Sequence, residues 1–255
     1  MEVHHHAHLA SGETHTSRKK WTHYFWEFFM LFLAVTAGFF VENQREHFVE
    51  HQRAKQYASF LHSDLVKDTI NLSARMQYMT SGIKAMDTLI FILKSFKPDT
   101  VEKKIYELSS YSFSNPVFTP NNSTIDQLKN SGSLRYFQNK KLVRNFSDYD
   151  NELQNMKIID DRNLYIIEEI RKFLTQFLDL KGVPLPRIVG TDSSIQEQSS
   201  VPLKLYKKDP TQFQQYANLC TLKQLDWRNR IRLMDRTLNS ARNLILSLKQ
   251  EYHLE

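Results

Sequence analysis

The chain has 255 residues, of which 41% are hydrophobic and 24% charged, and its formal net charge is +6. This charge is mild and spread along the chain, which excludes the dense basic patch of a nucleic-acid-binding domain. A single cysteine excludes an internal disulfide, and only six glycines argue against a turn-rich all-β fold.

Residues 1–20 form a polar segment rich in histidine. Imidazole is a good ligand for Zn²⁺, Ni²⁺ and Cu²⁺, so His4, His5, His6 and His8 are candidate metal ligands. Such tracts are more often incidental or weak chelators than ordered sites. We predict a flexible tail without a metal site, and we predict no cofactor.

Residues 21–41 are apolar along almost their whole length. As a helix they span roughly 31 Å, about the thickness of a bilayer's hydrocarbon core. Trp21, Tyr24 and Trp26 stand at one end, where aromatic rings favour the membrane interface. The sequence therefore predicts one transmembrane helix. The alternative is a cleaved signal peptide, but Glu27 interrupts its apolar region and the apolar run continues beyond the candidate cleavage site.

One face of this helix combines a carboxyl group with small side chains. Glu27, Leu31, Ala34 and Gly38 follow a three-and-four spacing and therefore share that face. Ala34 and Gly38 form a small-xxx-small pair, which lets helices approach closely in lipid. We predict that this face associates with another helix. The competing interpretation is an interfacial glutamate with small residues by chance.

Basic residues set the expected orientation of the helix. Arg18, Lys19 and Lys20 directly precede it, whereas the basic residues after it are dispersed. The positive-inside rule then places the N-terminus in the cytoplasm and the rest of the chain outside.

Three long stretches follow that lack proline apart from Pro210 at the start of the third, with expected helices at about 42–97, 138–181 and 209–253. Apolar residues in each recur at alternating steps of four and three, as in helices that pack along a shared seam. In the second stretch the stripe shifts after Met156, which implies a local change of winding or of packing partner. The first stripe comprises Leu61, Leu65, Asp68, Leu72, Met76, Met79, Ile83, Met86, Ile90 and Leu93.

The connections complete the expected architecture. Capping-box patterns begin at Asp99 and Thr124, and Gly132 is a helix stop. Residues 183–208 form a long Pro- and Ser-rich loop, after which Asp209 caps a helix with Pro210 at its first position. We predict an all-α protein: one transmembrane helix and an elongated antiparallel helical bundle, residues 42–255, with coiled-coil-like long helices.

The sequence offers little chemistry. Residues 47–51 match the H-x-x-E-H zinc pattern, but a solvated juxtamembrane helix explains them better. Nucleotide-binding and nucleophile-elbow motifs are missing. Asp160-Asp161 and Glu168-Glu169 are interpreted as solvated, salt-bridged faces rather than catalytic pairs. Cys220 occupies a periodic apolar position, as a small core residue does. We therefore predict that the protein is not an enzyme.

Two segments resemble known sequences. HYFWEFFMLFLAVTAGFFVENQREH is similar to the anchor of uncharacterised Bacteroidota membrane proteins that often begin with a His-rich stretch. STIDQLKNSGSLRYFQNKKLV resembles the central motif of a related domain-of-unknown-function family with one transmembrane helix. The resemblance implies a bacterial inner-membrane protein with a periplasmic helical domain, and it implies no activity.

The function expected from these features is that of a membrane-anchored scaffold or interaction protein. Its partners are the lipid bilayer and a second copy or another membrane protein, with no nucleic acid. One alternative is a periplasmic ligand sensor that acts with a partner through the aromatic loop at residues 111–118. Another is a channel or ion-coupled subunit that uses Glu27.

Overall fold

The computed structural model describes residues 17–95, 98–183, 205–206 and 209–254. The protein is all-α, and no strand occurs in these ranges, where Leu178 and Leu205 form an isolated bridge. Its elements are α1 (Ser17–Ser95), α2 (Pro98–Ser112), α3 (Ser123–Asn130), the 3₁₀ helix η1 (Ser133–Tyr136), α4 (Lys140–Phe177), the 3₁₀ helix η2 (Leu180–Gly182) and α5 (Pro210–Tyr252).

The chain divides into two compact units, Met1–Arg53 and Ala54–Glu255, and α1 contributes to both. In the first unit α1 contains a stretch that is long and apolar enough to cross a membrane, by length and composition. None of that stretch is buried against another part of the protein. The His-rich tract lies outside the described residues.

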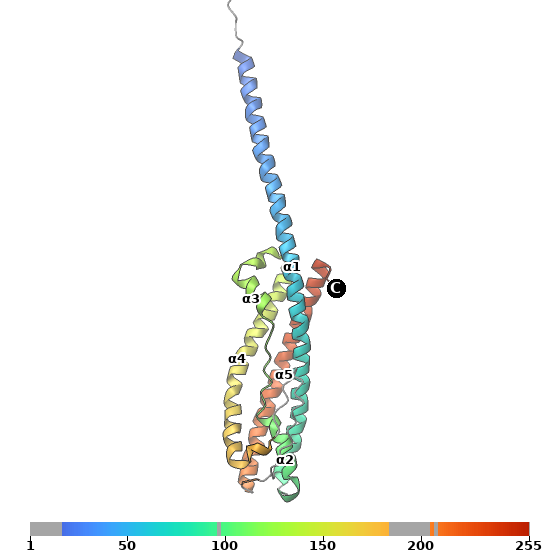
Figure 1. The fold of residues 1–255 in the computed structure, drawn as a ribbon, viewed down its shortest axis with the longest axis vertical. Helices are drawn as coiled ribbons and strands as arrows, with labels where there is room; N and C mark the ends of the chain where they lie inside the picture. Colours follow the sequence, from blue (N-terminus) through green and yellow to red (C-terminus); the bar gives the residue numbers. More distant parts are fainter. Residues whose placement is uncertain (1–16, 96–97, 184–204, 207–208, 255) are drawn as a thin grey trace, which may run out of the picture. The chain divides into compact units, whose positions relative to one another are not determined.

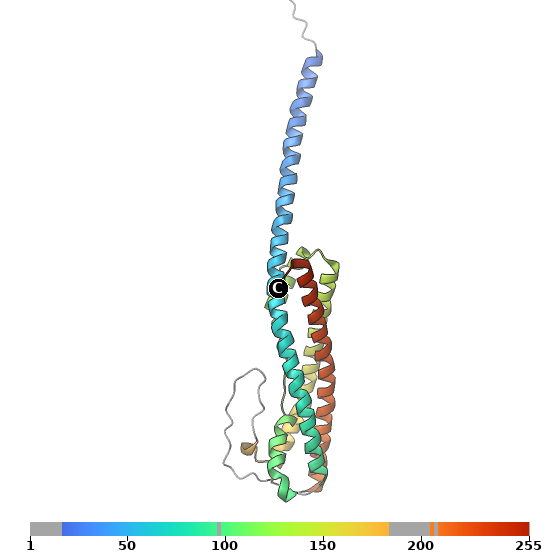
Figure 2. The ribbon, with the colours of Figure 1, turned by 90° about the vertical axis from the view of Figure 1, so that its right-hand side faces the viewer.

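Three long helical segments lie side by side in the second unit: α1 from Ala54 onward, α4 and α5 (Figures 1 and 2). Contacts between α1 and α4 advance in the same direction along both helices, from Asp68 with Tyr149 to the neighbouring charges of Arg75 and Asp160. α5 runs antiparallel to α4, because its residue numbers decrease along the contacts as those of α4 increase. These contacts join Asn145 with Ser247, Met156 with Thr237, and Asp160 with Arg230.

Because α1 and α4 run parallel, the chain between them must return along the bundle, and it does so through α2, residues 113–122 and α3 (Figure 2). We call residues 113–122 the strap. Its side chains alternate, with Ser114, Pro116 and Phe118 buried and the residues between them half-buried. This period of two is that of an extended chain. The segment expected to form an open aromatic loop therefore packs half of its side chains inward.

The strap is attached by side-chain hydrogen bonds. Ser114 Oγ lies 2.9 Å from Tyr78 Oη on α1. Asn121 donates its backbone N–H and its side-chain amide to Asp68 Oδ1, at 3.0 and 2.6 Å. Within the described strap a single backbone hydrogen bond, from Val117 N–H to the Asn115 carbonyl oxygen, adds to these contacts, so polar side chains hold the strap in place.

Helix ends follow the local sequence in most places. Asp209 accepts a hydrogen bond from Thr211 N–H with Pro210 at the first helical position, as predicted. Gly132 adopts a left-handed φ of 67° just beyond α3, which confirms the expected stop. The capping box at Thr124 is wrong: α3 begins at Ser123, and the Thr124 hydroxyl instead donates to Asp64 Oδ2 at 2.6 Å.

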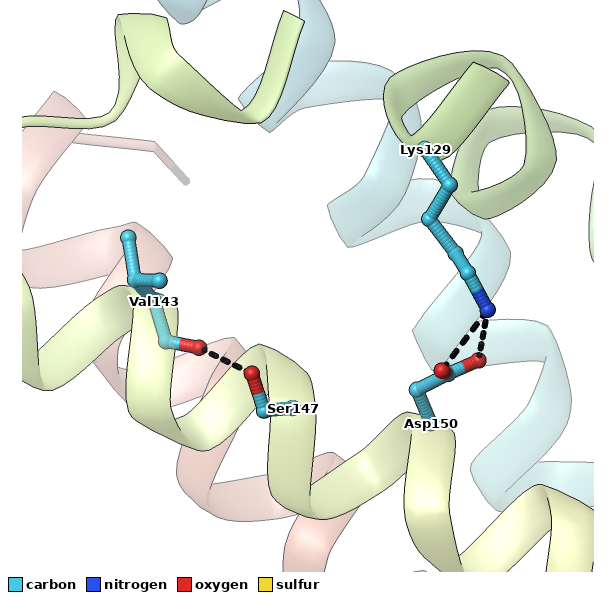
Figure 3. A network of polar contacts seen from close by, with 4 residues as sticks. All are labelled: Lys129, Val143, Ser147 and Asp150. Atoms are coloured by element: carbon cyan, nitrogen blue, oxygen red, sulfur yellow. Dashed lines mark hydrogen bonds and ion pairs between the residues drawn. The ribbon is translucent and has the colours of Figure 1, made fainter. Parts of the chain in front are cut away.

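A second tie joins α3 to α4. Lys129 Nζ donates to both carboxylate oxygens of Asp150, at 3.0 and 2.8 Å (Figure 3). One turn earlier on α4, Ser147 donates to the Val143 carbonyl oxygen (Figure 3). The Lys129–Asp150 pair is partly exposed, so it orients α3 more than it stabilises the fold.

The apolar interior is divided in two. The first core contains Trp227 and most of the α1 stripe, together with the first half of α4 and the second half of α5. The second core contains Leu89 and Leu93 of α1, the end of α4 and the start of α5, where Cys220 is fully buried as predicted. Along α4, Met156 is the last buried residue of the first core and Ile170 is the first of the second. The half-buried Ile159 and Ile166 pack against the first and the second core.

Candidate functional site

The first candidate site is the exposed surface of α1 between Trp21 and Val41. The backbone is helical because the stretch contains no proline, and every described side chain on it is exposed. Its rings stack on one another along the helix: Phe25 on Phe29 and Phe28 on Phe32. Thr36 satisfies its hydroxyl by donating to the Phe32 carbonyl oxygen at 2.8 Å. The stretch therefore presents an apolar surface with few unmet polar groups.

The predicted association face lies on this surface. Glu27, Leu31, Ala34 and Gly38 are all exposed, and Leu31 retains 67% of its accessible area. A Cβ added at Gly38 would meet no atom within 4 Å. The stacked rings lie on the other side of the helix by the 100° step of residues. The small residues and the single carboxyl group therefore lie together on the side of the helix away from the stacked rings.

The zinc-like pattern at residues 47–51 forms no metal site with other described residues. His47 Nδ1 lies 4.0 Å from Glu50 on the exposed helix surface. Within the described chain, no group of three His, Cys, Asp or Glu side chains is placed to hold a metal ion. The pair of histidines is accordingly treated as part of a solvated helix.

The second candidate site is a set of buried or half-buried polar side chains in the second unit, on both sides of Trp227 along α5 and on the facing helices. We call it the polar belt, and it comprises Arg75, Asp160, Lys223, Gln224, Asp226 and Arg230. Its central member is Arg230, which is only 2% exposed. The Arg230 guanidinium donates to Asp160 Oδ1 at 2.6 Å, to Asn115 Oδ1 at 3.0 Å and to the Pro116 carbonyl oxygen at 3.3 Å. It thereby joins α5 to α4 and to the strap.

Asp160 corrects the prediction of a fully solvated acidic pair. Its side chain is 16% exposed and paired with Arg230. Burial raises its pKa, and the Arg230 charge opposes that rise. By contrast, Glu168 pairs with Arg171 and Glu169 with Lys172 on the surface, as the sequence suggested.

Lys223 is the most unusual group of the belt, because a lysine is rarely enclosed completely. Its side chain is 0% exposed, and its Nζ lies 5.6 Å from the centre of the Trp227 ring. Burial lowers the pKa of Lys223 to about 7, while the Asp226 charge opposes this change and Arg230 and Arg171 add to it. Burial also raises the pKa of Asp226, against the influence of Lys223 and Arg230.

Trp227 connects this lysine to α1. Its ring lies against Tyr78, at 6.1 Å between centroids, and a Cβ added at Gly82 would overlap it. Gly82 therefore provides the space that admits the indole, because it has no side chain. Beside it, Gln224 donates to the Ile83 carbonyl oxygen at 2.9 Å and to Asp87 Oδ1 at 2.8 Å.

Asp68, the only polar member of the predicted α1 stripe, is 1% exposed and belongs to a separate cluster. It accepts a hydrogen bond from the Tyr149 hydroxyl at 2.7 Å as well as those from Asn121. Burial raises the pKa of Asp68, and the hydrogen bonds from Tyr149 and Asn121 oppose that rise. This cluster fastens the strap to α1 and α4.

The sequence analysis did not identify Lys223 and Arg230 as buried, because charged residues on a helix are expected to face solvent. Their spacing does contain the information: Lys223, Trp227, Arg230 and Met234 follow the steps of four, three and four that define the buried face of α5. A charged residue in register with a tryptophan on a buried stripe is the pattern to look for.

Comparison with family models, with curated proteins and with solved structures found no match. The resemblance to Bacteroidota anchors and to a domain-of-unknown-function family therefore stays a prediction.

Proposed function

We propose that this protein is a single-pass, membrane-anchored scaffold or interaction protein without enzymatic activity. Its transmembrane segment is residues 21–41, and its extramembrane part is an elongated helical bundle with coiled-coil-like long helices. Following the positive-inside rule and the Bacteroidota resemblance, we place it in a bacterial inner membrane, with the N-terminus in the cytoplasm and the bundle in the periplasm.

The observation that carries this proposal is the uniform exposure of the apolar stretch of α1. Its side chains from Trp21 to Val41 are all exposed, although fourteen of them are large apolar groups. Exposed apolar surface on this scale is costly in water and is stable in lipid. The polar groups of a helical backbone are satisfied within the helix, which is the condition for crossing a bilayer.

Self-association through Glu27, Leu31, Ala34 and Gly38 follows from the shape and polarity of that face. Gly38 has open space around its Cα, so a second helix can approach closely there. Among the described residues, none forms a hydrogen bond or ion pair with Glu27. A carboxyl group in or near lipid is stabilised by a polar partner on a neighbouring helix, and a second copy supplies one on the same face.

Mass measurement in nanodiscs tests this proposal. We expect a defined oligomer for the wild type and a monomer for Gly38→Leu, because a bulky side chain prevents close approach of the helices. Phe39→Leu, about 100° around the helix from Gly38 and off the association face, is the matched control and is expected to keep the oligomer. A monomeric wild type, or equal masses for all three proteins, would contradict the self-association.

A further inference from the structure

One end of the helical unit is formed by the start of α4, the last turn of α5 and the turns of α1 that follow Ala54 (Figures 1 and 2). Asn139, the N-cap of α4, donates to Glu251 Oε2 of α5 at 2.6 Å. The rings of Phe137 and Tyr252 lie 5.9 Å apart at the same end. Because α1 runs parallel to α4, its first turns in this unit lie at this end as well.

Basic side chains gather at this end of the unit. The chain between residues 131 and 145 contains four basic residues and no acidic one, and all four side chains are exposed. We call these four the basic end: Arg135, Lys140, Lys141 and Arg144. The three on α4 fall within about 100° around the helix, so they share one side of it. Arg135 lies over the Tyr136 ring, 5.4 Å from its centre.

The three α4 side chains of the basic end lack an acidic partner within the described ranges of the chain. Glu251 of the adjoining α5 turn binds the amide of the N-cap instead. Asp148 follows Arg144 by one turn without forming an ion pair with it. Near the other end of α4, by contrast, Arg171 and Lys172 pair with glutamates on their own helix. Positive charge is therefore left available at one end of α4 alone.

The position of two of these side chains is unfavourable for α4 itself. Lys140 and Lys141 occupy the first turn of the helix, which contains no acidic residue. A helix N-terminus carries partial positive charge, so basic side chains there oppose the helix dipole. The Asn139 side chain already accepts from the N–H groups of Lys141 and Leu142. Charge that works against its own helix indicates a use outside the chain.

The length of α1 makes the membrane surface the anionic partner within reach. Only residues 42–53 separate the apolar stretch from Ala54, and twelve helical residues rise about 18 Å. The headgroup layer accounts for about 5–8 Å of that length. Attraction between basic groups and an anionic lipid surface extends over a Debye length, about 8–10 Å near physiological ionic strength. An acidic protein partner has no comparable tether to this chain.

We propose that the basic end binds anionic phospholipid headgroups of the membrane in which α1 is anchored, and so holds the helical unit to the lipid surface. The two arginines and two lysines contact lipid phosphates, and the Arg135–Tyr136 pair combines a cation with an aromatic ring, as favoured at a membrane interface. This inference rests on the proposed membrane anchoring. It adds the class of lipid and the residues that recognise it.

Energy transfer from the basic end to the lipid surface provides the test. A donor dye is attached to Gln138→Cys, an exposed position, in full-length protein with Cys220→Ala, and the nanodiscs contain a headgroup-labelled acceptor lipid. We expect more efficient transfer in discs with one third phosphatidylglycerol than in discs of phosphatidylcholine alone. The difference should disappear in 1 M salt, where the Debye length is about 3 Å.

Two triple variants with the same change of net charge identify the responsible residues. Lys140→Gln, Lys141→Gln and Arg144→Gln together are expected to lower transfer in the anionic discs to the value in neutral discs. The matched control replaces three exposed lysines elsewhere on the unit and should keep the difference: Lys84→Gln, Lys94→Gln and Lys157→Gln. Circular dichroism verifies that both variants are folded.

Equal transfer in the two kinds of disc, for a chain that is inserted in both, would overturn this inference and leave the membrane anchoring intact. A difference that survives in the first triple variant, or that both triple variants lose alike, would overturn it too. A chain that does not remain with the nanodiscs on purification would overturn both the anchoring and this inference.

Discussion

Helix α1 contains two apolar stretches that differ in pattern and in environment. Between Trp21 and Val41 apolar side chains surround the helix, and all of them are exposed. Between Ala54 and Leu93 most apolar side chains form one stripe, whose members are buried or half-buried in the helical unit. The difference teaches that periodicity, rather than apolar content, distinguishes a helix that packs against protein from one suited to lipid.

The largest difference in stability between the two stretches is expected for a pair of matched leucine substitutions in α1. Leu72 is 0% exposed, so Leu72→Ala should destabilise the helical unit by about 2–5 kcal/mol through lost burial and a residual cavity. Leu31→Ala, in the exposed stretch, should change the stability of that unit by less than about 0.5 kcal/mol. Chemical denaturation of the full chain in detergent measures both. Equal effects would contradict the division of α1 into two environments.

A pair of glycines offers a smaller test of the same division. At Gly82 an added methyl group overlaps the Trp227 ring and contacts Tyr111, so Gly82→Ala should cost about 1–3 kcal/mol despite its better helix propensity. At Gly38 there is open space, so Gly38→Ala should leave the unfolding free energy of the helical unit unchanged. Thermal unfolding followed by circular dichroism compares them. A stabilised Gly82→Ala variant would mean that the indole does not occupy this slot.

The polar belt is an exception to the rule that a buried helix face is apolar, because the buried face of α5 there carries charged side chains. The pKa of Lys223 is near 7 when folded and near its ordinary value of 10.5 when unfolded. The unfolded state therefore binds more protons between these values, and stability rises with pH across that window and is constant below it. Lys223→Met removes this dependence.

We expect the stability advantage of Lys223→Met over the wild type to be greatest below pH 7. It should shrink above pH 7 by up to about 1.4 kcal/mol per pH unit. Urea unfolding at pH 6, 7, 8 and 9 provides the measurement. An advantage that grows with pH would have the wrong sign for a buried amine.

The sequence allowed much of this architecture to be predicted, and the reasons are local. Each member of the predicted α1 stripe is buried or half-buried, since a helical period is written directly into the spacing of its apolar residues. Asp209 and Pro210 likewise specify the start of α5 by themselves. The expected helix limits of 138–181 and 209–253 compare with Lys140–Phe177 and Pro210–Tyr252.

What could not be predicted depends on contacts between distant parts of the chain. Thr124 fits a capping box, but Asp64 from α1 competes for its hydroxyl. The strap lies inward because Arg230, Asp68 and Tyr78 bind its polar groups, and none of these partners is near it in sequence. Lys223 and Arg230 were missed because their burial depends on neighbours from other helices. The predicted face of Glu27, Leu31, Ala34 and Gly38 concerns a partner outside the chain and stays a prediction.

Accessibility along α1 tests the central claim most directly. Single spin-labelled cysteines, placed from residue 25 to residue 93 in a Cys220→Ala background, can be exposed in lipid vesicles to oxygen, which concentrates in lipid, and to a water-soluble nickel chelate. We predict high oxygen and low nickel accessibility at positions 28–40, with both lower at Ala34 and Gly38. Beyond Ala54 we predict low accessibility to both at stripe positions such as Leu72 and high nickel accessibility between them. High nickel accessibility at Phe32 and Val35 would contradict the membrane-spanning role of this stretch.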